Sequence, residues 1–420
     1  MDDPSWRMSA GPCARMVRGW GHGLERDRRG KHSPFVPMAS FPCYGSDARL
    51  LTEPAMLHET DDLFSSAWPD GPAAPKLVGA APARALAYPE LRYMGSKRRL
   101  LPWIHAVLDE LDFESALDPF CGTGCVAYLM KAMGRRVTAS DFLLFPSIIA
   151  AATVGNSSAM LDSGTLGRLL SHAPDDDFIA RTFDGVFFTA ADRAFLDRVS
   201  AGLRALDDPD RRAVGYAALF RSCLKRQPRG VFTVSGDLAR YDDGRRDLRL
   251  SLEEHFHEQV EAFNAVVFSN GRDCGAMRAD ALAIDPSDYD LVYLDPPYVP
   301  RSDDNCYVKR YHFLEGLASY WKDVELMPQT KVKKIAKRYT PFSYRRTALA
   351  AFEALFERFA RSTIVLSYSS NGYPDLATLE GLLSRYKSRV TVHERPHRYH
   401  FGTHGSVKRA SVTEYLIVGR

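Results

Sequence analysis

A stretch of about thirty residues constrains the fold of this chain most strongly. Residues 115–120 have the pattern of a short strand, a glycine-bearing turn follows at 121–124, and residues 136–141 have the pattern of a second strand. Between them, apolar side chains recur at helical spacing, at Val126, Leu129, Met130 and Met133. A helix that connects two strands is typical of a parallel pair, because parallel strands cannot be joined by a short hairpin and need a long crossover connection. The sequence therefore predicts an α/β fold.

Further patterns extend this sheet and divide the chain. A continuous apolar strand at 290–294 ends at Asp295, and the other expected elements are strands at 363–369, 389–393 and 412–418 and helices at 97–111, 345–359 and 375–386. Residues 151–271 are mainly helical in pattern, with helices expected around Phe187 to Val199 and at 216–224, and breaks at 225–230 and 241–246. We therefore expect a sheet domain in two parts, 88–150 and 272–420, separated by an insertion at 151–271.

Residues 1–87 differ from the rest in composition. They hold ten of the 25 prolines and show no helical or strand period. Such a segment buries too little apolar surface to offset its conformational entropy, so we expect a disordered extension. A basic arm that contacts DNA is the alternative, built from Arg26, Arg28, Arg29 and Lys31.

Composition excludes several classes of protein. The sequence is 25% charged and 45% hydrophobic, with a net charge of +3, which is typical of a globular protein and too mild to indicate nucleic-acid binding. No apolar stretch approaches the ~20 residues of a membrane helix, and the first thirty residues lack the apolar core of a signal peptide. Because no membrane helix is expected, we also expect no membrane partner. Seven cysteines form no disulfide framework, which predicts a reducing, cytoplasmic compartment.

The turn Asp118-Pro119-Phe120-Cys121-Gly122-Thr123-Gly124 lies where an open α/β sheet binds its ligand, beyond the carboxyl end of a strand. Gly122 and Gly124 let the backbone approach a ligand, and Asp141, which closes the second strand, can accept hydrogen bonds from both hydroxyls of a ribose. Together they favour a cofactor that contains adenosine. Ala127 replaces the third glycine of the dinucleotide fingerprint, which argues against NAD, and no Gly-Lys-Ser/Thr follows, which argues against a nucleotide triphosphatase.

Asp295-Pro296-Pro297-Tyr298, directly after the apolar strand, is the sharpest motif. Two prolines stiffen the loop and remove two donors, so that it presents a carboxylate, the Pro296 carbonyl and an aromatic ring together. These groups match a planar exocyclic amine, such as that of adenine. Two acceptors draw the amine toward tetrahedral geometry and expose its lone pair, while Tyr298 stacks on the base for roughly 1–3 kcal/mol.

With these motifs the chain resembles the DNA N6-adenine methyltransferases of the alpha group, the Dam-like class, from Tyr88 to its end. In that family the cofactor turn comes first, a target-recognition insertion second and the Asp-Pro-Pro-Tyr loop last, and an aromatic residue, a glycine and a lysine precede the first helix. Here Tyr93-Met94-Gly95-Ser96-Lys97 occupies that place, with Tyr where Trp is frequent. The resemblance implies a Rossmann-like S-adenosylmethionine-dependent methyltransferase sheet with a mainly helical inserted target-recognition domain.

The resemblance also implies an activity and its residues. The methyl group of S-adenosylmethionine would move in a single displacement to N6 of an adenine flipped out of double-stranded DNA. Catalytic roles are expected for Asp295, Pro296 and Tyr298. The residues expected at the cofactor are Tyr93, Lys97, Asp118, Phe120, Gly122, Gly124, Asp141, Asp280 and Asp295. A cognate restriction endonuclease is a candidate partner.

Basic residues cluster despite the small net charge. Residues 301–350 hold eleven Lys and Arg against five Asp and Glu, and residues 381–420 hold eight against two. Clustering of this kind is what phosphate contacts require. The expected DNA contacts are Arg221, Lys225, Arg226 and Arg229 in the insertion and Lys333 and Lys334 after the Asp-Pro-Pro-Tyr loop.

Other interpretations remain open at this point. An amino-methyltransferase could act on cytosine N4, on RNA or on a protein amide, although Asp before Pro-Pro-Tyr favours adenine. A catalytically silent DNA-binding relative would be expected to have an eroded cofactor turn or acceptor loop, and a nicotinamide oxidoreductase leaves the Asp295 loop without a role. Cys121 and Cys125 straddle the glycine turn without matching Cys or His residues, so we expect no metal site.

Overall fold

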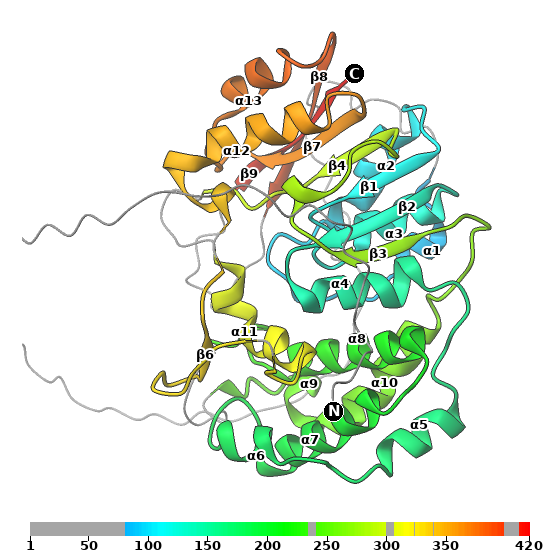
Figure 1. The fold of residues 1–420 in the computed structure, drawn as a ribbon, viewed down its shortest axis with the longest axis vertical. Coiled ribbons are helices and arrows are strands. Elements are labelled where there is room, and N and C mark those ends of the chain that lie inside the picture. Colours follow the sequence, from blue (N-terminus) through cyan, green and yellow to red (C-terminus); the bar gives the residue numbers. More distant parts are fainter. Residues whose placement is uncertain (1–79, 234–240, 300–305, 323, 339, 399–410) are drawn as a thin grey trace, which may run out of the picture. The chain divides into compact units, whose positions relative to one another are not determined.

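A seven-stranded sheet organises the part of the chain that the structure describes. The computed structural model describes residues 80–233, 241–299, 306–322, 324–338, 340–398 and 411–420 (Figure 1). The proposed basic arm at Arg26 to Lys31 lies outside these residues. The strand order is β3 (Gly275–Arg278), β2 (Arg136–Asp141), β1 (Ser115–Asp118), β4 (Leu291–Leu294), β7 (Thr363–Ser369), β9 (Ser411–Gly419) and β8 (Val390–Arg398).

The sheet is mixed but mainly parallel. The strands from β3 to β7 pair in parallel, whereas β9 runs antiparallel to both β7 and β8. The central strands β1 and β4 are buried throughout, which explains why β4 appears in the sequence as a continuous apolar run. The predicted α/β, Rossmann-like fold is therefore confirmed.

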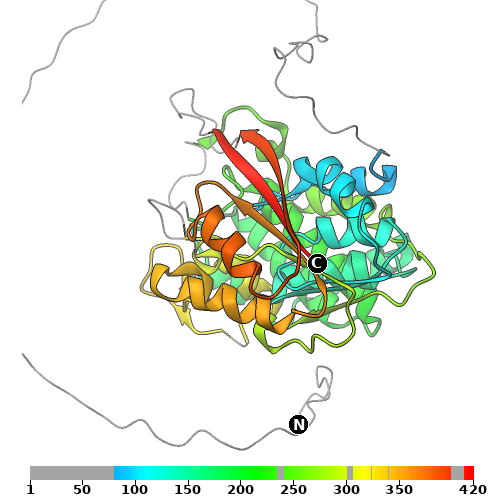
Figure 2. The ribbon, with the colours of Figure 1, turned by 90° about the horizontal axis from the view of Figure 1, so that it is seen from above.

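Helices cover both faces of the sheet. On one face, Val292 and Leu294 of β4 pack with α12 (Arg345–Arg358) and α13 (Leu376–Leu383). On the other, Leu291 and Tyr293 belong to a core shared with α2 (Leu101–Asp109), α3 (Cys125–Ala132) and α4 (Leu144–Ala150). Figure 2 shows β8 and β9 crossing between the α12–α13 pair and the blue and cyan helices of the amino-terminal part. Successive side chains of each strand thus point into different cores, as strand geometry requires.

The insertion is helical, as predicted, and packs beside α4. Its elements are a π-helical turn (Ala151–Gly155), α5 (Ser163–Leu170), α6 (Phe178–Thr182), α7 (Ala190–Arg204), α8 (Pro209–Arg226), α9 (Arg246–Arg249) and α10 (Leu252–Asn264). Reciprocal capping boxes begin α7, at Thr189 and Asp192, and α10, at Ser251 and Glu254.

Two helix predictions within the insertion were wrong in extent. Phe187 and Phe188 are buried but precede α7, and Phe187 has a φ of 63°, which no helix continues. The break expected at 225–230 begins later, because Lys225 and Arg226 are the last two residues of α8. In the first case an apolar pattern was extended beyond the true start of the helix. In the second, charged residues at the end of the helix were taken as a break. Tertiary packing decides both helix ends.

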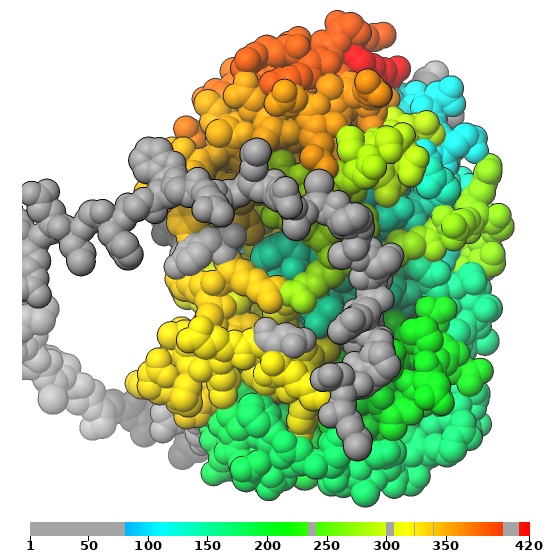
Figure 3. Space-filling model, in the orientation of Figure 1, coloured from blue at the N-terminus to red at the C-terminus, as the bar shows by residue number. Residues whose placement is uncertain are grey.

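The segment after the Asp-Pro-Pro-Tyr loop contains a helix and a short β-hairpin. Helix α11 (Tyr307–Ala318) contacts α4, α8 and β6, and β6 (Lys334–Ile335) pairs with β5 (Leu326–Met327) as an antiparallel hairpin. Figure 3 shows this yellow segment against the green atoms of the insertion and below the orange atoms of the carboxyl-terminal part. It therefore connects the sheet to the insertion.

Several boundaries differ from the sequence-based prediction. Helix α1 (Ala83–Leu86) lies within the expected extension, yet Ala85 is fully buried against the core. Strand β3 was not predicted, because its four residues are only partly buried and show no apolar run. The first predicted helix begins as a 3₁₀ turn (Arg98–Leu100), and β8 continues five residues beyond the predicted His393, to Arg398. Short 3₁₀ turns over Ala281–Ala283 and Pro341–Ser343 complete the described elements. No helix among the described residues is long and apolar enough to cross a membrane.

Candidate active site

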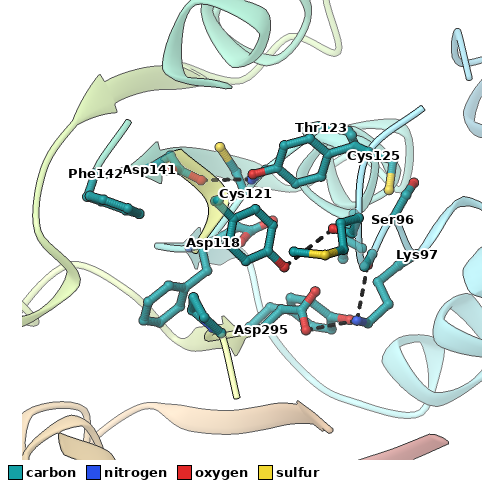
Figure 4. Close-up of a pocket in the computed structure, with 18 residues that line it drawn as sticks. Ser96, Lys97, Asp118, Cys121, Thr123, Cys125, Asp141, Phe142 and Asp295 are labelled. Carbon is teal, nitrogen blue, oxygen red and sulfur yellow. Dashed lines mark hydrogen bonds and ion pairs between the residues drawn. The ribbon is translucent and has the colours of Figure 1, made fainter. Parts of the chain in front are cut away.

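Three carboxylates meet at the carboxyl ends of three neighbouring strands. Asp118 ends β1, Asp141 ends β2, and Asp295 follows β4 directly. The alternation along each strand places all three on the same face, since Ala116, Val137, Ala139, Leu291 and Tyr293 all belong to the core beneath α2, α3 and α4. One cavity touches all three side chains (Figure 4). Its empty volume is about 580 Å³, counting the part that is open to solvent.

The glycine turn forms one wall of this cavity. Gly122 and Gly124 have φ angles of +50° and +78°, which favour glycine. A Cβ atom on Gly122 would lie 3.0 Å from the ring of Tyr93, so a side chain here would crowd the wall opposite the turn. Behind the turn, the Tyr88 hydroxyl donates to the Thr123 carbonyl at 2.5 Å. The backbone is therefore held close to the space that a ligand would fill.

Asp141 is held by backbone amides from both sides. Its Oδ2 accepts from Gly122 N at 3.1 Å, and its Oδ1 accepts from Leu143 N at 2.9 Å. Burial nevertheless raises the pKa of Asp141 to about 7, an effect that these two hydrogen bonds oppose and that the charge of Glu315 increases. The Asp141 carboxylate is therefore fixed between the glycine turn and the start of α4.

Asp295 is paired with a lysine from the segment before the first helix. Lys97 Nζ lies 2.9 Å from Asp295 Oδ1 and also donates to the Gly95 carbonyl at 3.3 Å. The Lys97 side chain is 6% exposed and that of Asp295 is 19% exposed. Burial raises the pKa of Asp295, while the neighbouring ammonium group opposes this shift. Lys97 therefore favours the ionised form of Asp295.

Carboxyl groups outnumber basic groups on the cavity wall. Burial, with the charges of Asp295 and Asp141, holds the pKa of Asp118 well above its usual range. Lys97 is the one Lys or Arg among the described residues that line the cavity. Such a site favours a ligand that carries positive charge.

Aromatic rings close the side opposite the glycine turn. The Tyr93 ring stacks on Tyr311 with a centroid distance of 4.8 Å and lies 5.4 Å from the ring of Tyr307. The Tyr311 hydroxyl accepts from Met94 N at 2.7 Å, and the Tyr307 hydroxyl donates to the Met94 carbonyl at 3.3 Å. Helix α11 thus holds the segment around Tyr93 in place.

The structure brings most of the predicted cofactor residues together. The cavity is lined by Tyr93, Lys97, Asp118, Phe120, Gly122, Asp141 and Asp295. Gly124, Asp280, Pro296 and Tyr298 are not among its lining residues. Gly124 lies next to Cys125 at the base of the turn, and Asp280 is exposed and accepts from Leu282 N at 3.0 Å. The Tyr298 ring packs edge-on against Tyr368 at 5.3 Å, beside the cavity rather than in it.

Sequence reasoning did not identify several lining residues. They are Met94, Gly95, Ser96, Cys121, Thr123, Cys125, Val126, Phe142, Tyr293, Pro297 and Tyr307. Most adjoin a predicted residue along the chain, so their inclusion follows from the motifs themselves. Tyr307 is different, because only the packing of α11 against Tyr93 brings it to the site, and no local signal could have found it. No cluster of His, Cys, Asp or Glu within the described part of the chain has the arrangement of a metal site.

Three of the four basic residues predicted in the insertion have partners within the chain. Arg221 donates to the Glu90 carbonyl at 2.9 Å and to the Gln259 side chain. Lys225 Nζ lies 2.8 Å from Asp247 Oδ1, and Arg226 Nε lies 3.1 Å from Asp192 Oδ2. These contacts hold α8 to its neighbours, so a contact with DNA would have to share or replace them. Arg229, just after α8, is exposed.

The second predicted basic pair lies on the β5–β6 hairpin. Lys333 has a φ of 49°, and its Nζ donates to the Pro328 carbonyl at 2.7 Å. Lys334 is the first residue of β6, and both side chains are partly exposed. The roles of all six basic residues remain predictions.

The cavity fits the chemistry of S-adenosylmethionine. This ligand combines a ribose, an ammonium group and a sulfonium group. Asp141 would offer acceptors to ribose hydroxyls, and Asp118 and Asp295 would offer carboxylates to the two cationic groups. Tyr93 and Phe142 supply aromatic surface beside the turn.

The chain is similar to DNA methyltransferases. The model of the family described as D12 class N6 adenine-specific DNA methyltransferase matches residues 93–366. The type II methyltransferase M2.HphI of Haemophilus parahaemolyticus is 27% identical over 325 residues, which cover 74% of this chain and 92% of that protein. The modification methylases LlaI of Lactococcus lactis subsp. lactis and StsI of Streptococcus sanguinis are each 24% identical over 70% of this chain, and the matches span 49% and 46% of their lengths.

Proposed function

The chain belongs to the D12 class N6 adenine-specific DNA methyltransferase family, which confirms the resemblance seen in its motifs, and from that premise we propose a specific reaction. The protein transfers the methyl group of S-adenosylmethionine to N6 of an adenine that has been flipped out of double-stranded DNA. One observation carries this proposal: a single cavity touches both the glycine turn with Asp141 and the Asp295 carboxylate. A donor held by the turn and an amine held by Asp295 would therefore meet.

The cofactor supplies a methyl group on a positively charged sulfur. Asp141 would accept hydrogen bonds from the ribose hydroxyls, and the turn at Gly122 would bring its backbone close to the ligand. Asp118, which is buried beneath the turn, would pair with the ammonium group. That pairing would lower the pKa of Asp118 from its raised value, because a neighbouring cation favours the ionised form.

Asp295 and Pro296 would hold the target amine. Lys97 occupies Oδ1 of Asp295, so Oδ2 is the oxygen that would accept one N–H bond of the amine. The carbonyl of Pro296 would accept the other. As the new C–N bond forms and the bond between sulfur and the methyl carbon breaks, S-adenosylhomocysteine would be released as a neutral thioether. The amine would gain positive charge, which a carboxylate fixed in advance stabilises. Its proton would then pass to water or to the Asp295 carboxylate.

Tyr298 would bind the flipped base by stacking. Its ring is partly exposed, and its edge-on contact with Tyr368 fixes its orientation beside the cavity. A base stacked on this ring would have its amine near Asp295, three positions earlier in the same loop. Flipping is required because the amine of a paired adenine is inaccessible to the cavity. DNA would be held by basic residues, for which Arg229, Lys333 and Lys334 are partly or fully exposed candidates.

The decisive experiment combines methyl transfer with mapping of the product. The purified chain is incubated with double-stranded DNA and cofactor labelled on its methyl group, and the modified bases are located by sequencing. N6-methyladenine at a defined sequence supports the proposal. N4-methylcytosine in the DNA, or transfer of label to RNA in a parallel reaction, would support the alternative amino-methyltransferases. Absence of any transfer, with cofactor still bound, would favour a silent DNA-binding relative.

Three variants at two residues test the proposed roles in the same assay. Asp295→Ala should reduce turnover by at least about a thousandfold while leaving duplex affinity within about twofold. Tyr298→Ala should reduce turnover strongly and Tyr298→Phe only mildly, since the ring is retained. Equal effects of the two Tyr298 substitutions would argue against stacking.

We also propose a role in DNA modification. Two of the relatives are modification methylases by name. DNA from cells that express the chain should then resist an endonuclease that cuts the methylated sequence. The proposed substrate also places the protein in the compartment that holds the DNA, which is the cytoplasm in a cell without a nucleus.

A further inference from the structure

A buried glutamate outside the cavity holds the start of α4. Glu315 lies in the last turn of α11 and is 1% exposed. Its Oε2 accepts from Leu144 N at 2.9 Å and from Phe145 N at 3.2 Å, and its Oε1 lies 3.1 Å from Leu144 N. A helix has unpaired amides in its first turn, and here a side chain from a distant segment accepts two of them.

Two arginines from other segments face the same carboxylate. Arg278 Nη2, at the end of β3, and Arg338 Nη1, after β6, each lie 3.6 Å from Glu315 Oε1. Burial raises the pKa of Glu315, and the two backbone amides and Arg278 oppose that shift. Burying a carboxylate is costly unless several partners compensate. Three segments supply them here: the start of α4, the end of β3 and the segment after β6.

The turn that Glu315 holds also contains the contact to Asp141. Leu143 N donates to Asp141 Oδ1, and the next amide, Leu144 N, donates to Glu315. Ser147 Oγ tightens the same turn, since it contacts the carbonyls of both Asp141 and Leu143 at 3.2 and 2.8 Å. A shift of the Leu143–Leu144 peptide would therefore move a hydrogen bond to Asp141.

We propose that Glu315 is a positioning residue for the cofactor site: by holding the first amides of α4, it keeps Leu143 and Asp141 where the ribose is bound. The inference rests on the proposed function, because it needs Asp141 to bind the cofactor. Glu315 contacts neither the cavity nor the reacting groups, so it acts on cofactor affinity and not on the methyl-transfer step.

The position of Arg338 extends this link toward the DNA side. Arg338 follows the hairpin that carries Lys333 and Lys334, and its guanidinium reaches the carboxylate that holds α4. The Arg338 side chain is 39% exposed, whereas Glu315 is buried. A movement of the hairpin on DNA binding would therefore shift Arg338 and its contact with Glu315. Through Glu315 it would also shift the start of α4 and the hydrogen bond to Asp141.

The test is Glu315→Gln, which keeps the size of the side chain and removes its charge. One amide oxygen cannot accept from two backbone amides and face two guanidinium groups as the carboxylate does. The dissociation constant for S-adenosylmethionine, measured by calorimetry, and its KM should each rise roughly tenfold, with kcat within about twofold of wild type. An unchanged dissociation constant, or a fall in kcat without a rise in KM, would overturn the proposal.

Asp197→Asn is the matched control. Asp197 is also a buried carboxylate on a helix, and it accepts from Ile179 N at 2.9 Å and Ala180 N at 2.8 Å at the start of α6. Its removal should lower the melting temperature to a similar degree without changing cofactor affinity. If Asp197→Asn weakened cofactor binding as much as Glu315→Gln, the effect would be general destabilisation and the proposal would fail.

Substitution of the arginines provides a second route if Glu315→Gln does not fold. Arg278→Gln and Arg338→Gln should each raise the KM for the cofactor about two- to fivefold, and no change in either would count against the proposal. The wild-type protein separates the two levels of inference. If it does not bind S-adenosylmethionine at all, the proposed function fails; if it binds and Glu315→Gln binds equally, only this inference fails.

Discussion

The ammonium group of Lys97 lies 2.9 Å from Oδ1 of Asp295, although the two residues are far apart in the sequence. Lys97 comes from the segment before the first sheet strand, and Asp295 comes from the loop after β4. Their contact joins the cofactor side of the cavity to the side where the target amine is expected. The contact also favours the ionised form of Asp295, on which the proposed reaction depends.

Replacing Lys97 should shift the pH dependence of the reaction. Burial raises the pKa of Asp295 and Lys97 opposes that rise, so Lys97→Met should raise this pKa further. Because the reaction needs ionised Asp295, activity would be lost at the acid side first. The acid limb of the kcat/KM profile should move to higher pH, so that the loss of activity relative to wild type is larger at the acid end of the profile than at the alkaline end.

Lys97→Arg is the control for this shift, because it retains a positive charge near Asp295. Its acid limb should stay close to that of wild type even if its activity falls. An identical acid limb in Lys97→Met and wild type would show that the ion pair does not control the ionisation of Asp295.

Asp141→Asn should abolish cofactor binding and still stabilise the free protein at neutral pH. Burial raises the pKa of Asp141 to about 7, so its carboxyl holds a proton more tightly in the folded chain than in the unfolded chain. Its contribution to stability is therefore fully present below about pH 4 and is lost as the pH rises through about 7. Asn resembles the protonated acid and avoids this loss.

The stability of the Asn variant should match wild type near pH 4 and exceed it by about 4 kcal/mol at pH 8, because the pKa rises from 3.8 to about 7 and each pH unit corresponds to about 1.4 kcal/mol. Denaturant unfolding at both pH values measures this difference, and calorimetry measures the loss of S-adenosylmethionine binding. Equal stabilities at pH 8 would contradict the assigned pKa, and retained cofactor binding would contradict the assigned role.

Gly122→Ala should weaken cofactor binding by more than its cost in stability explains. The position has a positive φ, and the new Cβ would lie 3.0 Å from the Tyr93 ring at the cavity wall. Strain of about 1 kcal/mol is expected from the backbone alone. Displacement of Tyr93 or of the turn should add a further loss of roughly tenfold in cofactor affinity.

Gly134→Ala offers a matched comparison. Gly134 also has a positive φ, of +84°, but nothing among the described residues lies within 4 Å of a Cβ there, and it is absent from the cavity wall. Its stability should fall by a similar amount while cofactor affinity stays unchanged. Equal affinities of the two variants would place the ligand away from Gly122.

Removing Lys333 and Lys334 together should weaken DNA binding in a salt-dependent way. The double Gln variant loses two charges on the β5–β6 hairpin, so the slope of log affinity against log salt should flatten by about 2. The double variant Arg361→Gln with Arg389→Gln removes the same number of charges just before the amino ends of β7 and β8, and it should leave the slope unchanged. Equal slopes in both double variants would place the DNA surface elsewhere.

The sheet strands that carry the motifs could be predicted well from local pattern. Residues 136–141 and 363–369 were predicted as strands with the bounds they have, because both contain β-branched side chains, which favour strands. Strand β3 was missed because it lies at the edge and is only partly buried, so its four residues carry no apolar run. Phe187 was misplaced because an apolar side chain is equally compatible with a helix and with a buried bend of positive φ.

The glycine turn, Asp141 and the Asp295 loop were chosen from the sequence alone, because each motif joins a strand end to a particular chemistry within a few residues. Which distant groups surround them was decided only by tertiary structure. The Lys97–Asp295 contact, Tyr307 at the cavity and Glu315 beneath Asp141 each join segments that no spacing rule connects. The physical reason is that local sequence determines which backbone conformations are possible, whereas the pairing of buried charges and rings depends on how whole elements pack.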